Sequence, residues 1–316
     1  MKLNKNTTIV GVLNVNKPSG MTSHDVVDRI RRAAKIKQVG HTGTLDPMAT
    51  GVLPICVGRA TKIQQFLIAQ DKEYDVKMEL GLITDSQDRT GEVIEERPMP
   101  DLSRENVEKT LLQFTGEIMQ TPPMISAKHH KGKRLYELAR QGVEVKRDPC
   151  KITIHKLELT DIQPPYVHFL VTCSKGTYIR TLCHDIGEAM NSGAVMAGLS
   201  RVRCGRFHID QSVDLADLRT PDDVAAKLFD LNQALDSMPS VMVGTEGKTS
   251  MFCGRSLAGG AITRRIGDFT SGAFIRVTSR DGALIGVGEA LMASDQLDSL
   301  AGNLRVIKPV KVFHTA

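Results

Sequence analysis

The sequence predicts an α+β protein with a large domain and a smaller β-rich domain at the C-terminal end. The chain has 316 residues, which is long for a single domain. Segments with the period-two alternation of strands are interspersed with amphipathic helical segments up to about residue 240. From about Val241 onward the chain changes to short, glycine-rich strands. We therefore expect one domain over residues 1–240 and a second over residues 241–316.

The composition is ordinary for a soluble globular protein and argues against several kinds of site. No stretch approaches the roughly 20 apolar residues of a membrane span. The N-terminal segment has no apolar core of signal-peptide length, so we expect a cytoplasmic protein without a membrane partner. The six cysteines are scattered without a CxxC pair, which argues against a disulfide framework and a structural zinc site. The net charge of +5 does not by itself establish a nucleic-acid partner.

The N-terminal third alternates between predicted strands and helices. In order, the segments are a strand over 9–15, a helix capped by Ser23 that runs through Lys35, a strand over 51–57, a helix over 60–69, a strand over 73–80 and a helix capped by Ser103. Tyr74 shares one face of its strand with Val76 and Met78, and periodicity alone favours a core tyrosine there.

The rest of the chain follows the same rules. The segments are strands over 151–159 and 167–173, a helix over 181–190, a strand over 195–199, a helix over 221–235, a hairpin of 274–278 and 284–290 with an Asp-Gly turn, and a strand over 304–313. Tyr178 and Arg180 are two residues apart, so on an extended segment they project from one face. Arg201, Arg203 and Arg206 form either a second basic patch or a charged edge strand.

The stretch Val39–Pro54, VGHTGTLDPMATGVLP, is a loop built to hold one shape. Its glycines permit backbone conformations that other residues avoid, and its prolines fix φ and remove donors. Asp46 is the single carboxylate of this stretch, and Pro47 biases it away from helical geometry. Two interpretations remain open. Asp46 is a reactive group whose basic partner comes from elsewhere, or it only caps its own backbone in a turn.

The densest basic run follows the Pro-Pro pair at residues 122–123. It reads KHHKGKR and contains four Lys or Arg and no acidic residue: Lys128, Lys131, Lys133 and Arg134. A short helix over 135–141, stopped by Gly142, is expected next. The run is either a solvated surface loop or an arm that contacts phosphate groups.

Taken together, six segments resemble the TruB family of bacterial tRNA pseudouridine synthases, which modify uridine 55 in the TΨC loop. In family order they are LNVNKPSGMTSHDVV, GHTGTLDPMATGVLP, KEYDV, TDSQDRTG, PPMISAKHHKGKRLYELARQG and GTYIRTL. They span most of residues 9–210. The segment at about 122–142 resembles an insertion of the bacterial members that guide-RNA-dependent relatives lack. The C-terminal unit is similar to the PUA RNA-binding domain.

The resemblance implies the pseudouridine-synthase fold, in which helices flank a central mixed, mainly antiparallel sheet. An insertion at about 122–150 would contact RNA, and the partner would be the T-arm of tRNA, bound by a monomer. The reaction detaches uracil from the ribose C1′ at N1 and rejoins it through C5, after the base has been flipped out of its loop. Because no redox change occurs, we expect no cofactor and no metal.

Four residues receive catalytic roles from the resemblance. Asp46 is the carboxylate that acts at C1′, either as a nucleophile or in an elimination route. Arg180 pairs with Asp46 and keeps it ionised. Tyr74 stacks on the extruded base, so the resemblance overrides the core interpretation there, and Tyr178 helps to remove the C5 proton.

The same resemblance assigns contacts to RNA. His41 matches the histidine that enters the space left by the flipped base, and Leu199 matches an apolar pocket position. The remaining positions are polar or charged and lie around the target nucleotide or in the insertion: Lys17, Lys62, Asp88, Lys128, Lys131, Lys133, Arg134 and Arg140. After Leu199 the chain reads Ser200-Arg201-Val202 where the family has a second arginine and a threonine, which leaves the loop contacts there unassigned.

Two other functions remain as alternatives. A tRNA-folding chaperone would need binding alone, although the set of Asp46, Tyr74, Tyr178 and Arg180 argues against pure binding. An isomerase of ribosomal RNA is distinguished by mapping pseudouridines in total RNA with and without the protein.

Overall fold

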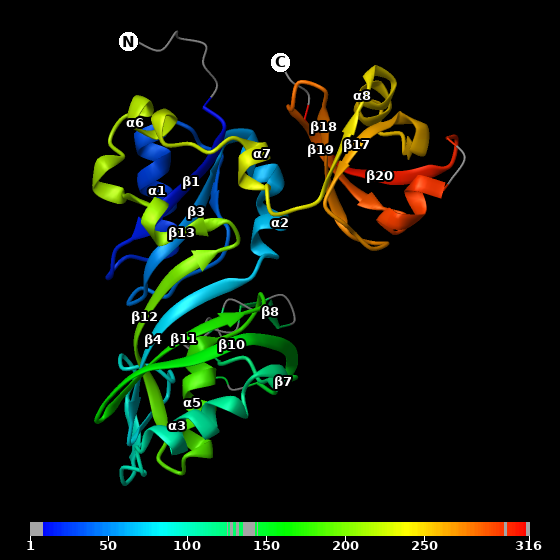
Figure 1. Ribbon diagram of the computed structural model, residues 1–316. Helices are drawn as coiled ribbons and strands as arrows, with labels where there is room; N and C mark the ends of the chain where they lie inside the picture. Colours follow the sequence, from blue (N-terminus) through cyan, green and yellow to red (C-terminus); the bar gives the residue numbers. More distant parts are fainter. Residues whose placement is uncertain are drawn as a thin grey trace.

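The computed structural model describes residues 9–124, 126, 129–130, 133–134, 143, 145–299 and 302–313. Within these residues the chain forms a ten-stranded sheet, a six-stranded sheet and two short two-stranded sheets. The ten-stranded sheet runs through the elongated N-terminal part, and the six-stranded sheet stands beside its upper half (Figure 1). The architecture is α+β, as the sequence predicts.

The large sheet has the order β14-β1-β3-β12-β4-β11-β10-β7, with β2 beside β3 and β13 beside β12. Its strands are β1 (Gly11–Lys17), β2 (Val39–His41), β3 (Thr50–Val57), β4 (Lys72–Leu80), β7 (Gly116–Gln120), β10 (Cys150–Gln163), β11 (Tyr166–Cys173), β12 (Ala194–Cys204), β13 (Phe207–His208) and β14 (Val213–Asp214). The pairs β1–β14 and β3–β12 are parallel and the others antiparallel. This confirms the predicted mixed, mainly antiparallel sheet.

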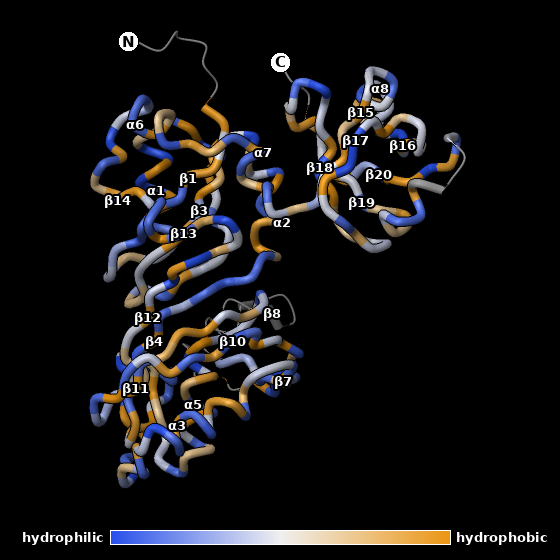
Figure 2. Tube along the Cα trace, viewed as in Figure 1, coloured by the Kyte–Doolittle hydropathy of each residue, from blue (hydrophilic) through white to orange (hydrophobic). Residues whose placement is uncertain are grey.

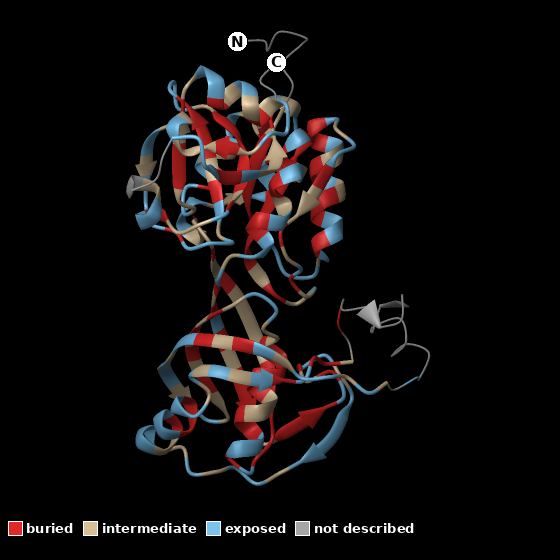
Figure 3. Ribbon diagram, turned by 90° about the vertical axis from the view of Figure 1, so that its right-hand side faces the viewer, coloured by how far each residue is buried: buried red, intermediate tan, exposed pale blue. Residues whose placement is uncertain are grey.

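Helices cover this sheet with their apolar faces. The three longest are α1 (Ser23–Ala34), α3 (Arg104–Leu112) and α5 (Ile179–Ala189). Their inward residues, among them Ile30, Val107 and Ile186, are fully buried in one apolar cluster with the strands. Burying a side chain of this size stabilises the fold by roughly 1.5–3 kcal/mol. Buried residues fill the interior of both halves of the large domain (Figure 3), and apolar stretches follow the same elements (Figure 2).

The start of α1 differs from the prediction by one residue. Thr22, not Ser23, is the N-cap: its hydroxyl accepts a hydrogen bond from the Asp25 amide, and the Asp25 carboxylate accepts one from the Thr22 amide. The Ser23 hydroxyl instead exchanges two hydrogen bonds with the backbone of Leu45. The start of α1 is thereby tied to the loop that carries Asp46.

The helix expected over 60–69 is a 3-10 helix, η1 (Gly58–Ile63), followed by α2 (Gln64–Ile68). The helix expected after Ser103 is present as α3. Ser103 occupies its N-cap position, but its hydroxyl donates to Asp101 and caps no backbone group of the helix.

The prediction of a single helix over 221–235 is wrong. The segment forms two short helices, α6 (Pro221–Ala226) and α7 (Leu231–Ala234). Between them Phe229 exchanges two backbone hydrogen bonds of 2.9 Å with Val12 on β1. Asp230 then starts α7 with a capping box. Pairing with the sheet therefore interrupts the helix.

The second sheet begins at Ser240 and has the order β16-β20-β19-β18-β15-β17. Its strands are β15 (Ser240–Val243), β16 (Leu257–Ala258), β17 (Ile262–Ile266), β18 (Phe274–Ser279), β19 (Leu284–Ala290) and β20 (Arg305–Val312), with α8 (Thr245–Phe252) packed on them. The predicted hairpin is present as β18–β19, and its turn contains the expected Asp281-Gly282 pair.

The two sheets are packed together. Phe66 of α2 meets Phe274 of β18 edge to face, with ring centroids 5.1 Å apart. The Arg276 guanidinium donates to the Asn232 side chain at 2.7 Å and to the Met238 carbonyl at 3.1 Å. An apolar cluster that includes Phe207 continues into the second sheet. The C-terminal unit is therefore anchored to the large domain by both apolar and polar contacts.

The remaining elements are short. They are β5 (Leu82–Thr84), β6 (Val93–Glu96), β8 (His129–His130), β9 (Lys133–Arg134), η2 (Ile209–Gln211), η3 (Leu215–Asp217), η4 (Gly259–Ala261) and η5 (Ser294–Ser299). In the predicted insertion, Lys128, Lys131, Arg140 and the helix expected over 135–141 lie outside the described residues. Lys133 and Arg134 are described only as the backbone of β9, which pairs with β8.

In the part of the chain that the structure describes, no helix is long and apolar enough to cross a membrane. All six cysteines are free thiols. Among the same described residues, no group of three or more His, Cys, Asp or Glu side chains is placed to hold a metal ion.

Candidate active site

The loop between β2 and β3 carries Asp46, and the Lys17 side chain of β1 anchors this loop through hydrogen bonds. The Lys17 ammonium is fully buried and donates to the carbonyls of Pro18, Pro47 and Ala49 at 2.9, 3.1 and 2.7 Å. Burial lowers the pKa of Lys17 to about 8, although the nearby Asp46 carboxylate opposes this shift. These bonds use all three Lys17 donors, so the structure places this predicted RNA contact beneath the loop as its anchor.

The partner of Asp46 is Arg180. Its Nε lies 3.0 Å from Asp46 Oδ2, and its Nη1 lies 3.5 Å from Asp88 Oδ2 and donates to the Ser86 carbonyl at 3.1 Å. Arg180 is 6% exposed, whereas one third of the Asp46 side chain remains accessible. The pairing implied by the family resemblance is therefore present. It leaves one face of the carboxylate open to a ligand.

The electrostatics of Asp46 differ from the expectation. Burial raises the pKa of this carboxyl above its ordinary 3.8, and the charge of Asp88 acts in the same direction. The Arg180 guanidinium and the Lys17 ammonium lower the pKa of Asp46, but burial outweighs them. Arg180 and Lys17 therefore limit the rise in the pKa of Asp46 but do not keep this pKa at its ordinary value.

Asp88 belongs to a compact turn that faces α5. Its Oδ1 accepts hydrogen bonds from the Ser86 hydroxyl and from the amide and hydroxyl of Thr90. Thr181 on α5 donates to the Gln87 side chain at 2.8 Å. Asp88 is 5% exposed, so the structure places this predicted RNA contact as a partner of Arg180.

The prediction that Tyr178 and Arg180 share one face of an extended segment is wrong. Helix α5 begins at Ile179, two residues earlier than expected, and Arg180 lies in its first turn. Tyr178 is the N-cap residue and is half-buried. The Gln120 side chain at the end of β7 fixes its backbone, accepting from its amide at 2.8 Å and donating to its carbonyl at 3.0 Å.

Tyr74 lies on β4 inside the apolar core and is 8% exposed. Arg201 on β12 is its direct neighbour in the antiparallel register. Burial raises the pKa of Tyr74 to about 12, against the charge of Arg201 and a side-chain hydrogen bond with it. The phenol is therefore protonated at physiological pH. The structure supports the core position expected from periodicity and leaves little of the ring accessible to a base.

The structure also describes three other predicted RNA contacts, which differ in their exposure. His41 is half-buried at the end of β2, and its Nδ1 accepts from the Gly43 amide at 3.3 Å. Burial and the charge of Arg201 lower the pKa of His41, so its ring is neutral at pH 7. Lys62 is exposed on η1, and Leu199 is half-buried on β12, opposite Val76 in the register.

Comparison with known proteins connects this geometry to a family. Residues 31–179 match the profile described as TruB family pseudouridylate synthase (N terminal domain), and residues 180–238 match the profile of the tRNA pseudouridylate synthase B C-terminal domain. The chain belongs to the TruB family. TruB-family members are isomerases, and the Asp46 loop lies inside the first matched region.

Three curated relatives show how far the similarity extends. Each is named tRNA pseudouridine synthase B. The protein of Clostridium tetani is 52% identical over 66% of this chain and 72% of its own length. That of Clostridium kluyveri is 48% identical over 75% and 81%, and that of Coxiella burnetii strain RSA 493 is 41% identical over 89% and 91%.

Solved structures share the fold. The chain is 27% identical to one chain of a Cbf5–Nop10–Gar1 complex, with a TM-score of 0.80 over 97% of this chain and 86% of that one. A chain of an archaeal box H/ACA sRNP Nop10–Cbf5 complex gives 25% identity and a TM-score of 0.76 over 97% and 87%. The predicted pseudouridine-synthase fold is thereby confirmed.

The structure brings two residues to this TruB-family site that the sequence does not place there, namely Arg201 and Gln120. The sequence predicts Arg201 in a surface patch or on an edge strand, but β12 is a central strand and Arg201 is 1% exposed. Arg203 pairs with Glu73 at 3.1 Å, so the basic patch is not formed by these two residues. Gln120 fixes the Tyr178 backbone from a strand that lies 58 residues away in the sequence. The one sequence signal for Arg201 is the glycine at position 51, since glycine in a strand permits the close approach of another backbone, here that of Arg201.

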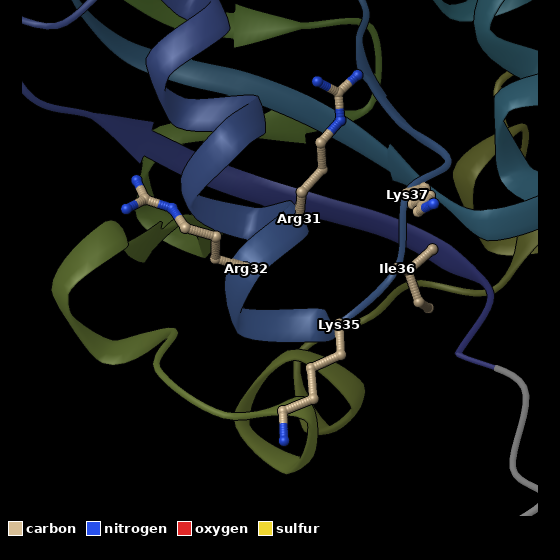
Figure 4. Close-up of a pocket in the computed structure, with 5 residues that line it drawn as sticks. All are labelled: Arg31, Arg32, Lys35, Ile36 and Lys37. Carbon is tan, nitrogen blue, oxygen red and sulfur yellow. The ribbon is translucent and has the colours of Figure 1, made fainter.

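A cavity of about 340 Å³ lies apart from this site, at the C-terminal end of α1. It is lined by Arg31, Arg32, Lys35, Ile36 and Lys37. Figure 4 shows that Arg31, Arg32 and Lys35 point in different directions around the helix end. Their charges do not converge on one point. Their positive charges instead interact favourably with the partial negative charge at the C-terminal end of α1.

Proposed function

We propose that this chain isomerises uridine 55 in the TΨC loop of tRNA to pseudouridine, with Asp46 acting at the ribose C1′. The observation that carries the proposal is the 3.0 Å ion pair between Arg180 of α5 and Asp46, whose loop is anchored by Lys17 and Ser23. The curated relatives, which are 41–52% identical and are named for a tRNA substrate, support the substrate class.

The reaction depends on a carboxylate placed at the ribose C1′. The bond between N1 and C1′ breaks, a bond between C5 and C1′ forms, and the proton on C5 leaves while the N1 position regains one. Asp46 either attacks C1′ or removes a proton from the sugar in an elimination route. Both routes require an ionised Asp46, which Arg180 favours against the effect of burial.

The target uridine must leave its loop before Asp46 can reach it. Extruding a base costs a few kcal/mol, and stacking on an aromatic ring returns roughly 1–3 kcal/mol. Although Tyr74 is only 8% exposed in this structure, we assign this stacking to its ring, as the family resemblance implies. We assign the neutral His41 ring to the space that the base leaves. Tyr178, at the start of α5, is proposed to help to remove the C5 proton.

The rest of the molecule is proposed to bind the T-arm. The basic insertion at about 122–150 would contact the phosphate backbone, together with Lys62 on η1. The C-terminal unit over 241–316 is proposed to be a PUA-like RNA-binding domain, and its packing against the large domain supports one continuous RNA-binding surface. We propose that the protein acts as a monomer in the cytoplasm.

Mapping pseudouridine in an unmodified tRNA transcript tests this proposal. The transcript is incubated with purified protein in the presence of a metal chelator, and pseudouridine is located by chemical modification and primer extension. We expect one modified position, uridine 55. A matched transcript with cytidine at position 55 should remain unmodified. Modification elsewhere, or none at all, would contradict the proposal, and mapping of total RNA separates a ribosomal RNA substrate.

A further inference from the structure

Arg201 is a buried cation that the proposed chemistry leaves unused. It lies on β12 between two neighbours, Gly51 of β3 on one side and Tyr74 of β4 on the other. It is 1% exposed and is among the largest fully buried side chains of the described chain. Burying a guanidinium costs several kcal/mol unless its donors are satisfied.

The Arg201 donors are satisfied by groups of the site. Nε donates to the Val52 carbonyl at 2.6 Å, and Nη2 donates to the Gly43 carbonyl at 3.2 Å. Tyr74 lies opposite Arg201 in the register of β4 and β12. Within the described residues, no carboxylate forms an ion pair with Arg201. Its side-chain hydrogen bonds therefore join β3 to the loop that leads to Asp46, and its strand register places both beside Tyr74 of β4.

The backbone around Arg201 is packed so closely that only glycine fits beside it. Gly51 has a φ of 97°, and a Cβ at this position would lie 2.3 Å from the Arg201 carbonyl oxygen. This contact fixes the distance between β12 and the start of β3. Strand β3 directly follows the loop that carries Asp46.

We propose that Arg201 is a positioning residue for isomerisation, one that holds the Tyr74 side chain and the Asp46 loop in a single geometry. The inference rests on the proposed function, since it concerns the same site. Arg201 contacts the carbonyl of Gly43 and makes no described ion pair with Asp46, so it acts through these neighbours. Misplacement of reacting groups by about 1 Å can lower a rate about 100-fold.

A conservative variant tests the role of the guanidinium geometry. Arg201→Lys keeps the charge but loses the planar fork that reaches Val52 and Gly43 together. We expect the single-turnover rate at saturating tRNA to fall by about 10- to 100-fold. We expect the Kd for tRNA to stay within about threefold, because Arg201 is 1% exposed and therefore out of reach of an RNA backbone at the surface.

Arg203→Lys is the matched control. Arg203 lies two residues further along β12 and pairs with Glu73 at a partly exposed position. Surface ion pairs contribute about 0–1 kcal/mol, so the rate of this variant should stay within about twofold of wild type. Thermal unfolding and circular dichroism confirm that both variants are folded at the assay temperature.

A double-mutant cycle separates positioning from a general loss of stability. Tyr74→Phe removes the only polar group of the side chain opposite Arg201 and leaves the ring in the core. If Arg201 acts through Tyr74, the double variant should lose little more rate than Arg201→Lys alone. Losses that multiply would overturn the proposal, as would a rate for Arg201→Lys within threefold of wild type. A loss confined to the Kd for tRNA would do the same.

Two further results keep the test decisive. If Arg201→Lys does not fold, Tyr74→Phe alone must slow turnover without changing the Kd, and an unchanged rate then contradicts the inference. The wild-type reaction in the same assay reports on the proposed function. If wild type modifies uridine 55 and the variants match it, only the inference about Arg201 fails.

Discussion

Two buried arginines meet the Asp46 loop in different ways. Arg180 ion-pairs with Asp46 at 3.0 Å and lies 3.5 Å from a second carboxylate, Asp88. Arg201 donates to the Gly43 carbonyl, and within the described residues no carboxylate pairs with it. One arginine therefore acts on the charge of the reactive group, whereas the other acts on its position. The comparison teaches that a buried cation is understood from the groups its donors reach, not from its burial.

Asp46→Asn should give the largest effect, because it removes the carboxylate that both arginines serve. We expect turnover to fall by roughly 10⁴-fold or more, as for other essential catalytic side chains. Binding of the tRNA transcript should be kept within a few-fold, because the asparagine is nearly isosteric. Filter binding and single-turnover kinetics measure the two quantities. A fall in turnover of less than about 100-fold in the pure variant would falsify the role of Asp46.

Arg180→Lys should give the next largest effect and sharpen the comparison with Arg201→Lys. A lysine keeps one charge but cannot reach Asp46, Asp88 and the Ser86 carbonyl together. We expect the rate to fall by about 10²- to 10³-fold, as when a preorganised donor is removed from an active site. A loss smaller than that of Arg201→Lys would reverse the order that the contacts predict.

The basic insertion should affect binding and leave chemistry unchanged. Replacing Lys128, Lys131, Lys133 and Arg134 by glutamine should weaken tRNA binding and reduce the slope of log K against log salt by up to about 3–4. The rate at saturating tRNA should not change. Replacing Arg31, Arg32, Lys35 and Lys37 removes the same number of charges and serves as the control. An equal change in slope for the control would show that the effect comes from net charge alone.

The chemistry of the site was predictable from the sequence, but part of its geometry was not. The Asp46 loop and its arginine partner follow from residue types and family resemblance. The helical position of Arg180 does not, because Tyr178 offers no side-chain cap and its backbone is fixed by Gln120 of a distant strand. The start of α5 is therefore set by a tertiary contact rather than by a local signal.

Arg201 was missed for a related reason. Period two places Arg201 and Arg203 on one face of a strand, which predicts similar exposure. The register against β4 shifts between these two residues: Arg201 pairs with Tyr74 and Arg203 with Glu73. A bulge of this kind leaves Val202 unpaired and sends the two arginines to different environments. Alternation in the sequence contains no sign of such a bulge.

The pH dependence of the single-turnover rate, compared between wild type and Asp88→Asn, tests the central claim most directly. The rate requires an ionised Asp46, so it should fall as pH decreases through the pKa of Asp46, which burial places above the ordinary 3.8. Asp88 raises the pKa of Asp46, and an asparagine keeps the Oδ1 acceptor of the turn without the charge. The acid limb of the rate profile should therefore move to lower pH in the variant. Circular dichroism checks that both proteins are folded over the pH range of the assay. An unmoved limb, or one shifted to higher pH, would contradict the account.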